Sequence, residues 1–186
     1  MKSLVLASSS PRRSEILAAA GIPFVKRPPE GVDETLLPGE SATGYVVRLA
    51  VEKARATRRS DGEVVLAADT CVVLDEEILG KPAGPDDAAR MLDRLQGRPH
   101  QVITGICLAG DGFEIGDLAC TTVRFSPLTP SEIDEYVRSG EPMDKAGAYG
   151  IQGLASRFVE RIDGCYFNVM GLPVSLVYRH LTSLGL

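Results

Sequence analysis

The sequence contains no tryptophan, only two histidines and four cysteines, and these shortages exclude several kinds of site. His100 and His180 lie far apart in the chain, which disfavours a histidine-based zinc site or a Ser-His-Asp triad, because such sites need converging partners. No two cysteines form a CxxC pair, and three of the four lie in apolar, strand-like runs, so we expect buried structural thiols. The cysteines are Cys71, Cys107, Cys120 and Cys165.

The chain also has little excess positive charge and no long hydrophobic run. Its net charge of −5 over 186 residues, with no tryptophan, disfavours a nucleic-acid-binding module, which usually presents a basic or basic-aromatic face. No apolar run approaches the roughly 18 residues of a membrane span. The opening residues, MKSLVLASSSP, lack a signal-peptide pattern. We therefore expect a cytoplasmic protein with no membrane partner and no stable nucleic-acid partner.

Strand and helix patterns alternate along the chain, which predicts an α/β fold formed by a single domain over residues 1–186. The predicted strands are 3–7, 64–68, 101–108, 118–125 and 158–162, with a hairpin arm within 71–80. The predicted helices are 11–20 before a stop at Gly21, 42–58, 85–95, a short one after Thr129, and a terminal one after Gly171-Leu172-Pro173. Residues 23–40 and 144–153 have no periodicity and are expected to be loops.

The stretch LASSSPRRSEIL, residues 6–17, combines a serine-rich turn with an unusual helix start. Ser10 is a candidate N-cap and Pro11 suits the first helical position. Arg12 and Arg13 then lie at the positive end of the helix dipole, which costs about 0.3–1 kcal/mol per charge unless an anion binds there. Helix N–H groups, serine hydroxyls and two guanidinium groups suit a phosphate chain. The alternative is two solvated arginines on an exposed turn.

Two further charged residues stand out against apolar surroundings. Lys53 falls on a helical stripe with Val46 and Leu49, so its amine either reaches the surface along that stripe or points into a polar cleft. Asp69 follows the apolar run VVLAA, where the end of a strand would place a carboxylate suited to binding a metal or activating water. The alternative for Asp69 is a turn-forming role. Thr70 adds a hydroxyl beside it.

Three weaker signals occur in segments expected to be irregular. Asp33-Glu34 in GVDET supplies carboxylates, and Lys81 in LGKP is a lysine without the spacing of a Walker A motif. Gln152 lies in GAYGIQG, where glycines permit close approach of backbone to a ligand and the amide complements the imide edge of uracil or thymine. Together, these cations, carboxylates and serines fit a metal-bound polyphosphate better than scattered surface charge.

Several motifs, in chain order, carry a family resemblance. They are LASSSPRRSEIL (6–17), VDE (32–34), YVVRLAVEKA (45–54), AADT (67–70), LGKP (79–82), TG (104–105), SGEPMDKAGAYGIQG (139–153) and GLP (171–173). On these motifs the chain resembles the Maf family of nucleoside triphosphate pyrophosphatases. The resemblance implies an elongated, twisted, mixed β-sheet flanked by helices, with two lobes around a central cleft as in ITPase-like proteins, and a homodimer.

The resemblance also implies a reaction and its residues. The expected reaction is hydrolysis between the α- and β-phosphates of a nucleoside triphosphate, with Mg²⁺ or Mn²⁺, giving the monophosphate and pyrophosphate. The implied catalytic residues are Glu34, Lys53, Asp69 and Lys81, with Glu34 and Asp69 as metal ligands and Asp69 as the family's proposed general base. The implied substrate-binding residues are Ser8, Arg12, Arg13, Thr70 and Gln152.

Within the family, Arg12, Thr70 and Gln152 match positions that mark the branch preferring dTTP and UTP. The resemblance also implies modified pyrimidine nucleotides as substrates, and a role in house-cleaning of the nucleotide pool or in cell-division arrest. Two alternatives are a pyrophosphatase acting on 7-methyl-GTP and a nucleotide-binding regulator of septum formation without turnover. We further expect nearby cations to hold the pKa of Asp69 low, which would favour its role as a metal ligand over that of a base.

Overall fold

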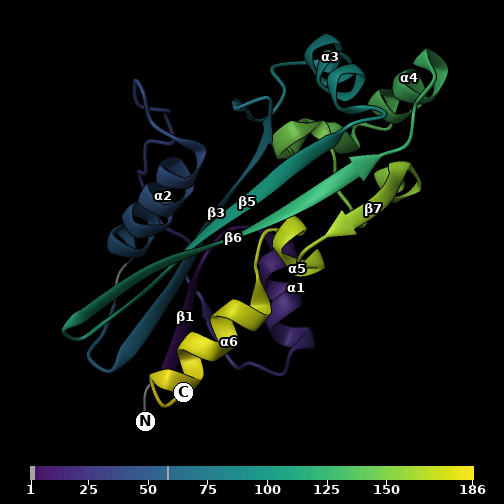
Figure 1. The fold of residues 1–186 in the computed structure, drawn as a ribbon. Helices are drawn as coiled ribbons and strands as arrows, with labels where there is room; N and C mark the ends of the chain where they lie inside the picture. The colour runs from purple at the N-terminus through teal and green to yellow at the C-terminus, as the bar shows by residue number, and fades with distance from the viewer. Residues whose placement is uncertain (1–2, 58) are drawn as a thin grey trace. The chain divides into compact units, whose positions relative to one another are not determined.

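The computed structural model describes residues 3–57 and 59–186, so Met1, Lys2 and Arg58 lie outside the description, including the predicted end of the helix at 42–58. Among the described residues, seven strands form one mixed sheet in the order β2-β1-β3-β5-β6-β7, with β4 paired to β3 (Figure 1). The strands are β1 (Ser3–Ala7), β2 (Val25–Lys26), β3 (Glu63–Leu74), β4 (Glu77–Leu79), β5 (Pro99–Gly110), β6 (Phe113–Phe125) and β7 (Val159–Asp163). The predicted α/β class is confirmed.

The helices divide between two compact units of the chain. The α-helices are α1 (Pro11–Ala19), α2 (Ala42–Ala56), α3 (Pro85–Leu95), α4 (Pro130–Arg138), α5 (Tyr166–Val169) and α6 (Val174–Ser183). The 3₁₀ helices are η1 (Glu141–Asp144), η2 (Ala146–Ala148) and η3 (Leu154–Phe158). The first unit comprises Met1–Thr70, Thr104–Ala119 and Gly171–Leu186, and the second unit comprises Cys71–Ile103 and Cys120–Met170.

In the first unit, the parallel strands β1 and β3 are buried on both faces. β1 pairs with β2 and with β3, and its pairing with β3 sets Val5 against Val65 and Ala7 against Ala67. These residues form a buried cluster with Ala50 and Ala54 of α2. Figure 1 shows α2 on one side of β1 and β3, and α1 and α6 on the other. Burial on both faces explains why these strands are continuous apolar runs.

The position of α2 on the sheet depends on Gly105 in β5. A Cβ atom added to Gly105 would overlap the carbonyl group of Val46 and would lie 2.7 Å from the backbone nitrogen of Val47. Real Cβ atoms do not approach backbone so closely, so only glycine lets the helix backbone lie directly against the strand. This close approach fixes the height of α2, and therefore of Lys53, above the sheet.

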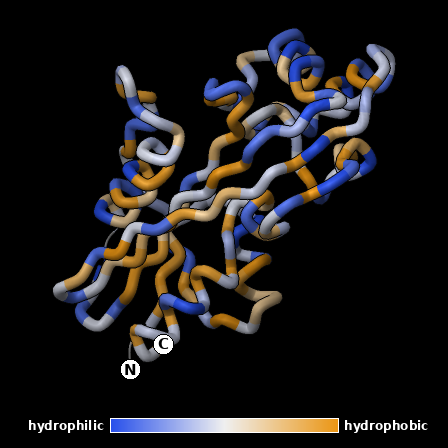
Figure 2. Tube along the Cα trace, in the orientation of Figure 1, coloured by the Kyte–Doolittle hydropathy of each residue, from blue (hydrophilic) through white to orange (hydrophobic). Residues whose placement is uncertain are grey.

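The second unit has an aromatic core between β6, β7 and the helices. Phe125 packs edge-to-face on Tyr149 with ring centroids 4.7 Å apart, and Tyr136 packs in the same way on Phe158 at 5.4 Å. α3 buries its predicted apolar face, and Figure 2 shows hydrophobic and hydrophilic residues on the same helix. α4 begins with a capping box in which Thr129 and Glu132 satisfy each other's backbone N–H groups.

Several sequence predictions are confirmed, and others are corrected. The strand at 3–7 and the helix at 85–95 have the predicted bounds, and Gly21 has the positive φ (69°) expected of a helix stop. The strand predicted to end at Asp69 instead continues to Leu74, because the apolar residues after Thr70 extend it into a hairpin with β4. Residues 144–153 contain 3₁₀ turns as well as loop, and β2 and α5 are too short to produce a periodic signal.

The cysteines only partly match the expectation of buried thiols. Cys71 and Cys107 are buried, and burial raises the pKa of Cys107 to about 12, which keeps it a thiol. Cys120 is exposed and Cys165 is intermediate, because each lies at a strand or turn position that faces outward. Among the described residues, no helix is long and apolar enough to cross a membrane.

Candidate active site

Lys53 lies between two carboxylates on the α2 side of the sheet. Its Nζ is 2.5 Å from Asp69 Oδ1 and 2.6 Å from Glu34 Oε1. Lys53 and Asp69 are only 9% and 8% exposed, so the pair is largely removed from solvent. The amine therefore does not extend to the surface along its apolar stripe, which decides between the two alternatives that the sequence left open. Lys53 is therefore a buried lysine whose amine is in contact with two carboxylates.

The pKa of Asp69 is raised, contrary to the expectation from its neighbours. Burial is the largest cause, and Lys53 and Arg13 oppose it without cancelling it, while the negative charge of Glu34 adds to the rise. The sequence shows the cations but not the loss of water around the carboxylate, so the predicted direction was wrong. A raised pKa makes Asp69 a better proton acceptor than an ordinary aspartate would be.

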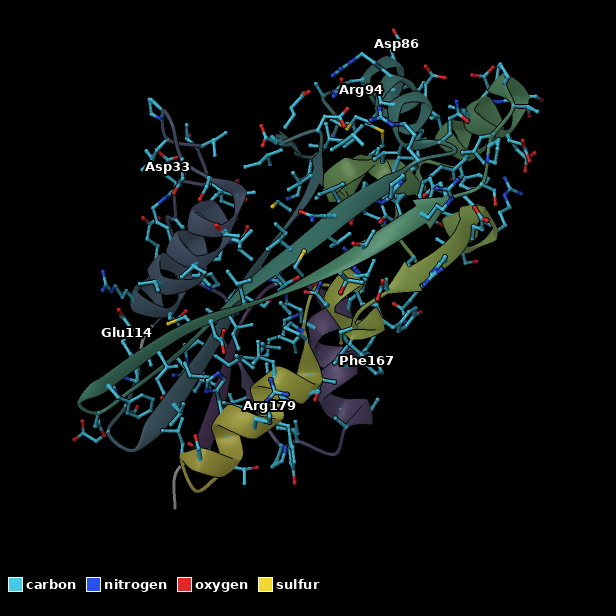
Figure 3. The ribbon with its side chains drawn as sticks, viewed as in Figure 1. Asp33, Asp86, Arg94, Glu114, Phe167 and Arg179 are labelled. Carbon is cyan, nitrogen blue, oxygen red and sulfur yellow. The ribbon has the colours of Figure 1, made fainter. Side chains whose placement is uncertain are left out.

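The loop before α2 is built so that Glu34 faces Lys53. Asp33, labelled in Figure 3, accepts hydrogen bonds from the backbone nitrogen of Thr35 at 2.9 Å and from its hydroxyl at 2.6 Å, which closes a local turn. The Tyr45 hydroxyl of α2 donates to the backbone carbonyl of Glu34 at 2.9 Å. Of the two predicted carboxylates, Asp33 therefore stabilises the loop, while Glu34 contributes its side chain to the charged cluster.

Arg13 lies on the opposite side of the sheet and contacts three separate segments. Its Nε donates to the Gly171 carbonyl at 2.7 Å, and its Nη1 donates to the Ala68 carbonyl at 2.7 Å. Its Nη2 donates to Thr70 Oγ1 at 3.2 Å, and Nη1 also lies 3.4 Å from Ser8 Oγ. Thr70 Oγ1 is in turn 3.0 Å from Thr104 Oγ1. Arg13 thus links the first helix, β3 and the turn before α6.

The start of α1 has donors that the protein itself does not use. Ser10 occupies the N-cap but its side chain makes no capping hydrogen bond, and the first turn contains no acidic residue. Ser8 Oγ instead accepts from the Ser10 nitrogen at 3.1 Å. Arg12 has no hydrogen-bond or ion-pair partner within residues 3–57 and 59–186, whereas Arg13 is fully engaged. The two adjacent arginines therefore differ in what they can offer to an anion.

Lys81 and Gln152 belong to the second unit. Both side chains are exposed, and neither has a polar partner in the described part of the chain. Their segments are joined, because the Gly147 nitrogen donates to the Gly80 carbonyl at 3.0 Å. Gly147 is needed there, since its φ is +67° and an added Cβ would lie 2.8 Å from the Val72 side chain.

The structure joins six of the nine predicted site residues by direct contacts within the first unit. Lys53 joins Glu34 to Asp69, and Arg13 joins Ser8 to Thr70, while Arg12 lies directly before Arg13 in the first turn of α1. Sequence reasoning assigned no role to Thr104, Gly105 or Gly171. Each lies in a recognised motif, TG or GLP, so the motifs were the signal that could have found them.

A family model described as Maf-like protein matches residues 3–184, which is nearly the whole chain. The chain belongs to the Maf family. The match extends over both units and includes every predicted site residue. It confirms the resemblance drawn from the motifs, and the clustered residues described above all lie within the matched region.

Similar proteins carry a consistent name. A dTTP/UTP pyrophosphatase of Symbiobacterium thermophilum is 52% identical over 186 residues, covering 100% of this chain and 95% of that protein. Proteins of the same name from Syntrophomonas wolfei and Geobacter metallireducens are 50% and 51% identical. These alignments cover 97% and 98% of this chain and 96% of each relative.

Two solved structures share the fold of this Maf protein at low sequence identity. The Staphylococcus aureus Ham1 protein has a TM-score of 0.56 at 16% identity, covering 98% of this chain and 99% of that chain. A HAM1 protein from Coxiella burnetii has a TM-score of 0.56 at 18% identity, covering 98% of this chain and 100% of that chain. The likeness places the fold among Ham1-like proteins, as the sequence predicted.

Proposed function

We propose that this Maf protein hydrolyses dTTP and UTP to the nucleoside monophosphate and pyrophosphate. The observation that carries the proposal is the Asp69–Lys53–Glu34 cluster, in which Lys53 and Asp69 are buried and Glu34 is half-exposed, in a chain about half identical over its full length to proteins named dTTP/UTP pyrophosphatase. Attack on the α-phosphate requires a positioned water, a proton acceptor and neutralisation of the leaving pyrophosphate. The cluster offers carboxylates for the first two tasks and a cation for the third.

The two carboxylates fit a hard divalent cation that is completed by substrate oxygens. The described residues contain no group of three or more potential ligands from histidine, cysteine, aspartate and glutamate. Mg²⁺ commonly binds through one or two carboxylates together with substrate phosphates, and Asp69 and Glu34 match that pattern. We propose that these two residues hold Mg²⁺ or Mn²⁺, which would supply electrostatic stabilisation of the phosphate oxygens when bound.

Asp69 is proposed to accept the proton of the attacking water. Lys53 keeps the carboxylate oriented through the 2.5 Å contact, which suits a base that takes a proton from a positioned water. Lys81 and Arg12 are proposed to neutralise charge on the phosphates, because neither is engaged by another described side chain. Arg13 has its donors on backbone carbonyls and hydroxyls, so we propose that it positions Ser8 and Thr70.

Preference for pyrimidine nucleotides is proposed to depend on Arg12, Thr70 and Gln152. Gln152 presents an exposed amide, which has the donor and acceptor needed for the imide edge of uracil or thymine. A site that hydrogen-bonds a polar edge rejects other bases strongly, because they leave its groups unpaired. A house-cleaning role in the nucleotide pool is consistent with that preference.

The proposal is tested with a panel of nucleoside triphosphates in the presence of Mg²⁺ or Mn²⁺, measuring pyrophosphate and orthophosphate separately. We expect dTTP and UTP to give pyrophosphate and the monophosphate, with activity abolished by EDTA and restored by the metal. Equal turnover of UTP and GTP would contradict the pyrimidine preference, and preferred turnover of 7-methyl-GTP would assign the other branch. Nucleotide binding without pyrophosphate release would support a regulator of septum formation.

We also propose that the protein is a cytoplasmic homodimer that does not form stable complexes with nucleic acid. The family resemblance supports the dimer, and the net charge of −5 supports the lack of nucleic-acid binding. Light scattering of the purified protein at several concentrations would give the mass of the assembly. A monomer mass throughout, or a salt-sensitive gel shift with DNA, would contradict the respective part.

A further inference from the structure

Gln152 is presented by a tight turn with both ends fixed in the second unit. The Gly153 nitrogen donates to the Gly150 carbonyl at 3.1 Å, so Ile151 and Gln152 occupy the two central positions. Ile151 is buried and only 6% exposed, whereas Gln152 is exposed. The buried isoleucine anchors one side of the turn, and the glutamine amide projects from the other.

Both ends of this turn are connected to the carboxylate of Glu141 by hydrogen bonds. Glu141 Oε2 accepts a hydrogen bond from the Leu154 nitrogen, immediately after the turn, at 2.9 Å. Glu141 Oε1 accepts from the Tyr136 hydroxyl at 2.9 Å, and that hydroxyl accepts from the Gly150 nitrogen at 3.3 Å. One carboxylate therefore holds the far end of the turn directly and the near end through a tyrosine.

The glycines of the turn fit closely around this support. A Cβ added to Gly153 would overlap the Glu141 carboxylate, so a larger residue there would have to displace that carboxylate from the turn. A Cβ added to Gly150 would lie 2.7 Å from Cε of Lys145, whose Nζ donates to the Glu141 carbonyl at 2.8 Å. The two glycines that flank Ile151 and Gln152 are thus set against Glu141 and Lys145.

Tyr136 is a rigid intermediate in this arrangement. It is fully buried, and its ring packs perpendicular to that of Phe158. Burial, followed by the hydrogen bond to Glu141, raises the pKa of Tyr136, so the hydroxyl keeps the proton that it donates to the carboxylate. A protonated hydroxyl can donate to Glu141 and accept from Gly150 at the same time, as the geometry requires.

We propose that Glu141 and Tyr136 are positioning residues that set the orientation of Gln152 for recognition of the pyrimidine base. This inference rests on the proposed function, since it assigns to Gln152 the reading of uracil or thymine. It adds two residues that do not contact the substrate but fix the backbone on either side of the residue that does. The two hydrogen bonds end on different oxygens of the Glu141 carboxylate, and a glutamine amide would replace one of these acceptors with an NH₂ donor.

The first test compares UTP with CTP, which differ at the base edge that Gln152 is proposed to read. Glu141→Gln and Tyr136→Phe should each lower the UTP-to-CTP ratio of kcat/KM about tenfold, as expected for lost hydrogen bonds to a charged group, mainly through KM for UTP. Glu135→Gln is the matched control, since Glu135 pairs with Arg157 at the surface of the same unit. Tyr166→Phe is the control for removal of a tyrosine hydroxyl.

A double-variant cycle decides whether the effect passes through Gln152. In a Gln152→Ala background, Glu141→Gln should change the UTP-to-CTP ratio less than about twofold, because the group that it positions is gone. A tenfold fall in that background would overturn the inference and assign Glu141 a general structural role. A kcat loss that is equal for both nucleotides would overturn it as well.

A measurement without nucleotide separates this inference from the proposed function. Amide hydrogen exchange in the peptide spanning residues 150–156 should be faster in Glu141→Gln than in Glu135→Gln, because the Leu154 and Gly150 amides lose their support. Unchanged exchange would overturn the proposed support of the turn, whatever the activity. Faster exchange in a protein whose wild type shows no UTP preference would instead overturn the assignment of Gln152 as base reader.

Discussion

Asp69 and Thr70 are adjacent in β3, yet their side chains serve opposite faces of the sheet. Asp69 contacts Lys53 of α2, and Thr70 contacts Arg13 of α1. Successive side chains of a strand point in opposite directions, so a step of one residue along β3 separates two sets of polar contacts on the two faces of the sheet.

Replacing Asp69 by asparagine should remove nearly all pyrophosphate release while leaving the fold intact. Asparagine keeps the size of the side chain but cannot accept a proton or bind a cation as a carboxylate does. Initial rates with UTP and dTTP, together with circular dichroism, measure the two effects. Glu114→Gln is the control, because Glu114 pairs with Arg55 on the same unit. More than about a tenth of wild-type turnover would contradict the assignment.

Removing Lys53 should destabilise the first unit, and removing Asp69 as well should restore part of the loss. Lys53→Met leaves a buried carboxylate without its cation, which costs about 3 kcal/mol of unfolding free energy. The double variant Lys53→Met/Asp69→Asn removes that uncompensated charge and should regain more than half of it. Urea unfolding at pH 7 measures both. Equal stability of the single and double variants would show that the contact with Asp69 does not matter.

Arg12→Ala and Arg13→Ala should behave differently in both stability and activity. Arg13 donates to the carbonyls of Ala68 and Gly171, so its loss leaves these acceptors unpaired and should cost about 2–4 kcal/mol and weaken turnover of all nucleotides alike. Arg12→Ala should leave the melting temperature nearly unchanged and alter preference among nucleotides. Thermal unfolding with kcat/KM for UTP and GTP checks this. Matching melting temperatures for the two variants would contradict it.

His100 should make the second unit lose stability in mild acid. Burial lowers its pKa to about 4, below the usual 6.5, so between these values the unfolded chain binds a proton that the folded chain does not. The free energy of unfolding that the neutral, buried His100 contributes is therefore fully present above pH 6.5. It is lost as the pH falls toward 4, by about 3 kcal/mol in all. Urea unfolding of wild type and His100→Gln at pH 7 and pH 4.5 isolates the effect. Parallel losses in the two proteins would contradict it.

Gly105→Ala should displace α2 and disable the charged cluster. The added Cβ would overlap the Val46 carbonyl, so the helix must move away from β5, at a cost of about 1–3 kcal/mol. Because Lys53 lies two turns further along α2, we expect a large fall in kcat as well. Gly84→Ala is the control, since a Cβ there meets nothing within 4 Å. Normal activity of the Gly105 variant would show that α2 adapts without moving Lys53.

Local patterns in the sequence predicted most of the fold. The apolar run at 3–7, the Ser10-Pro11 helix start and the amphipathic pattern at 85–95 each act over a few neighbouring residues, so their signals are complete in the sequence. The end of β3 was misplaced because Asp69 and Thr70 interrupt the apolar pattern, so the predicted strand and the predicted hairpin arm within 71–80 are in fact parts of one continuous strand that pairs with β4. β2 is only two residues long, and its residues are placed by pairing with β1, a long-range contact.

The sequence motifs identified the residues of the site, whereas the contacts that each residue makes became visible only in the folded structure. The motifs identified Arg12 and Arg13 together, but only the fold brings Gly171 to Arg13, 158 positions along the chain. In the same way, the sequence showed cations near Asp69, while the burial that raises its pKa depends on α2 packing against the sheet. Long-range contacts and loss of solvent are therefore what local patterns omit.

The pairing of β3 with β1 has a consequence for which changes in chain length the protein tolerates. The register sets Val65 against Val5 and Ala67 against Ala7, and counting onward from there determines which face Asp69 occupies. Inserting one residue between Val65 and Asp69 would exchange the faces of Asp69 and Thr70 and so remove both from their partners at once. The same insertion in the turn at Gly62, before the pairing begins, leaves Asp69 and Thr70 on their present faces of the sheet. Evolution can therefore vary the length of the chain before β3 but not within its first half.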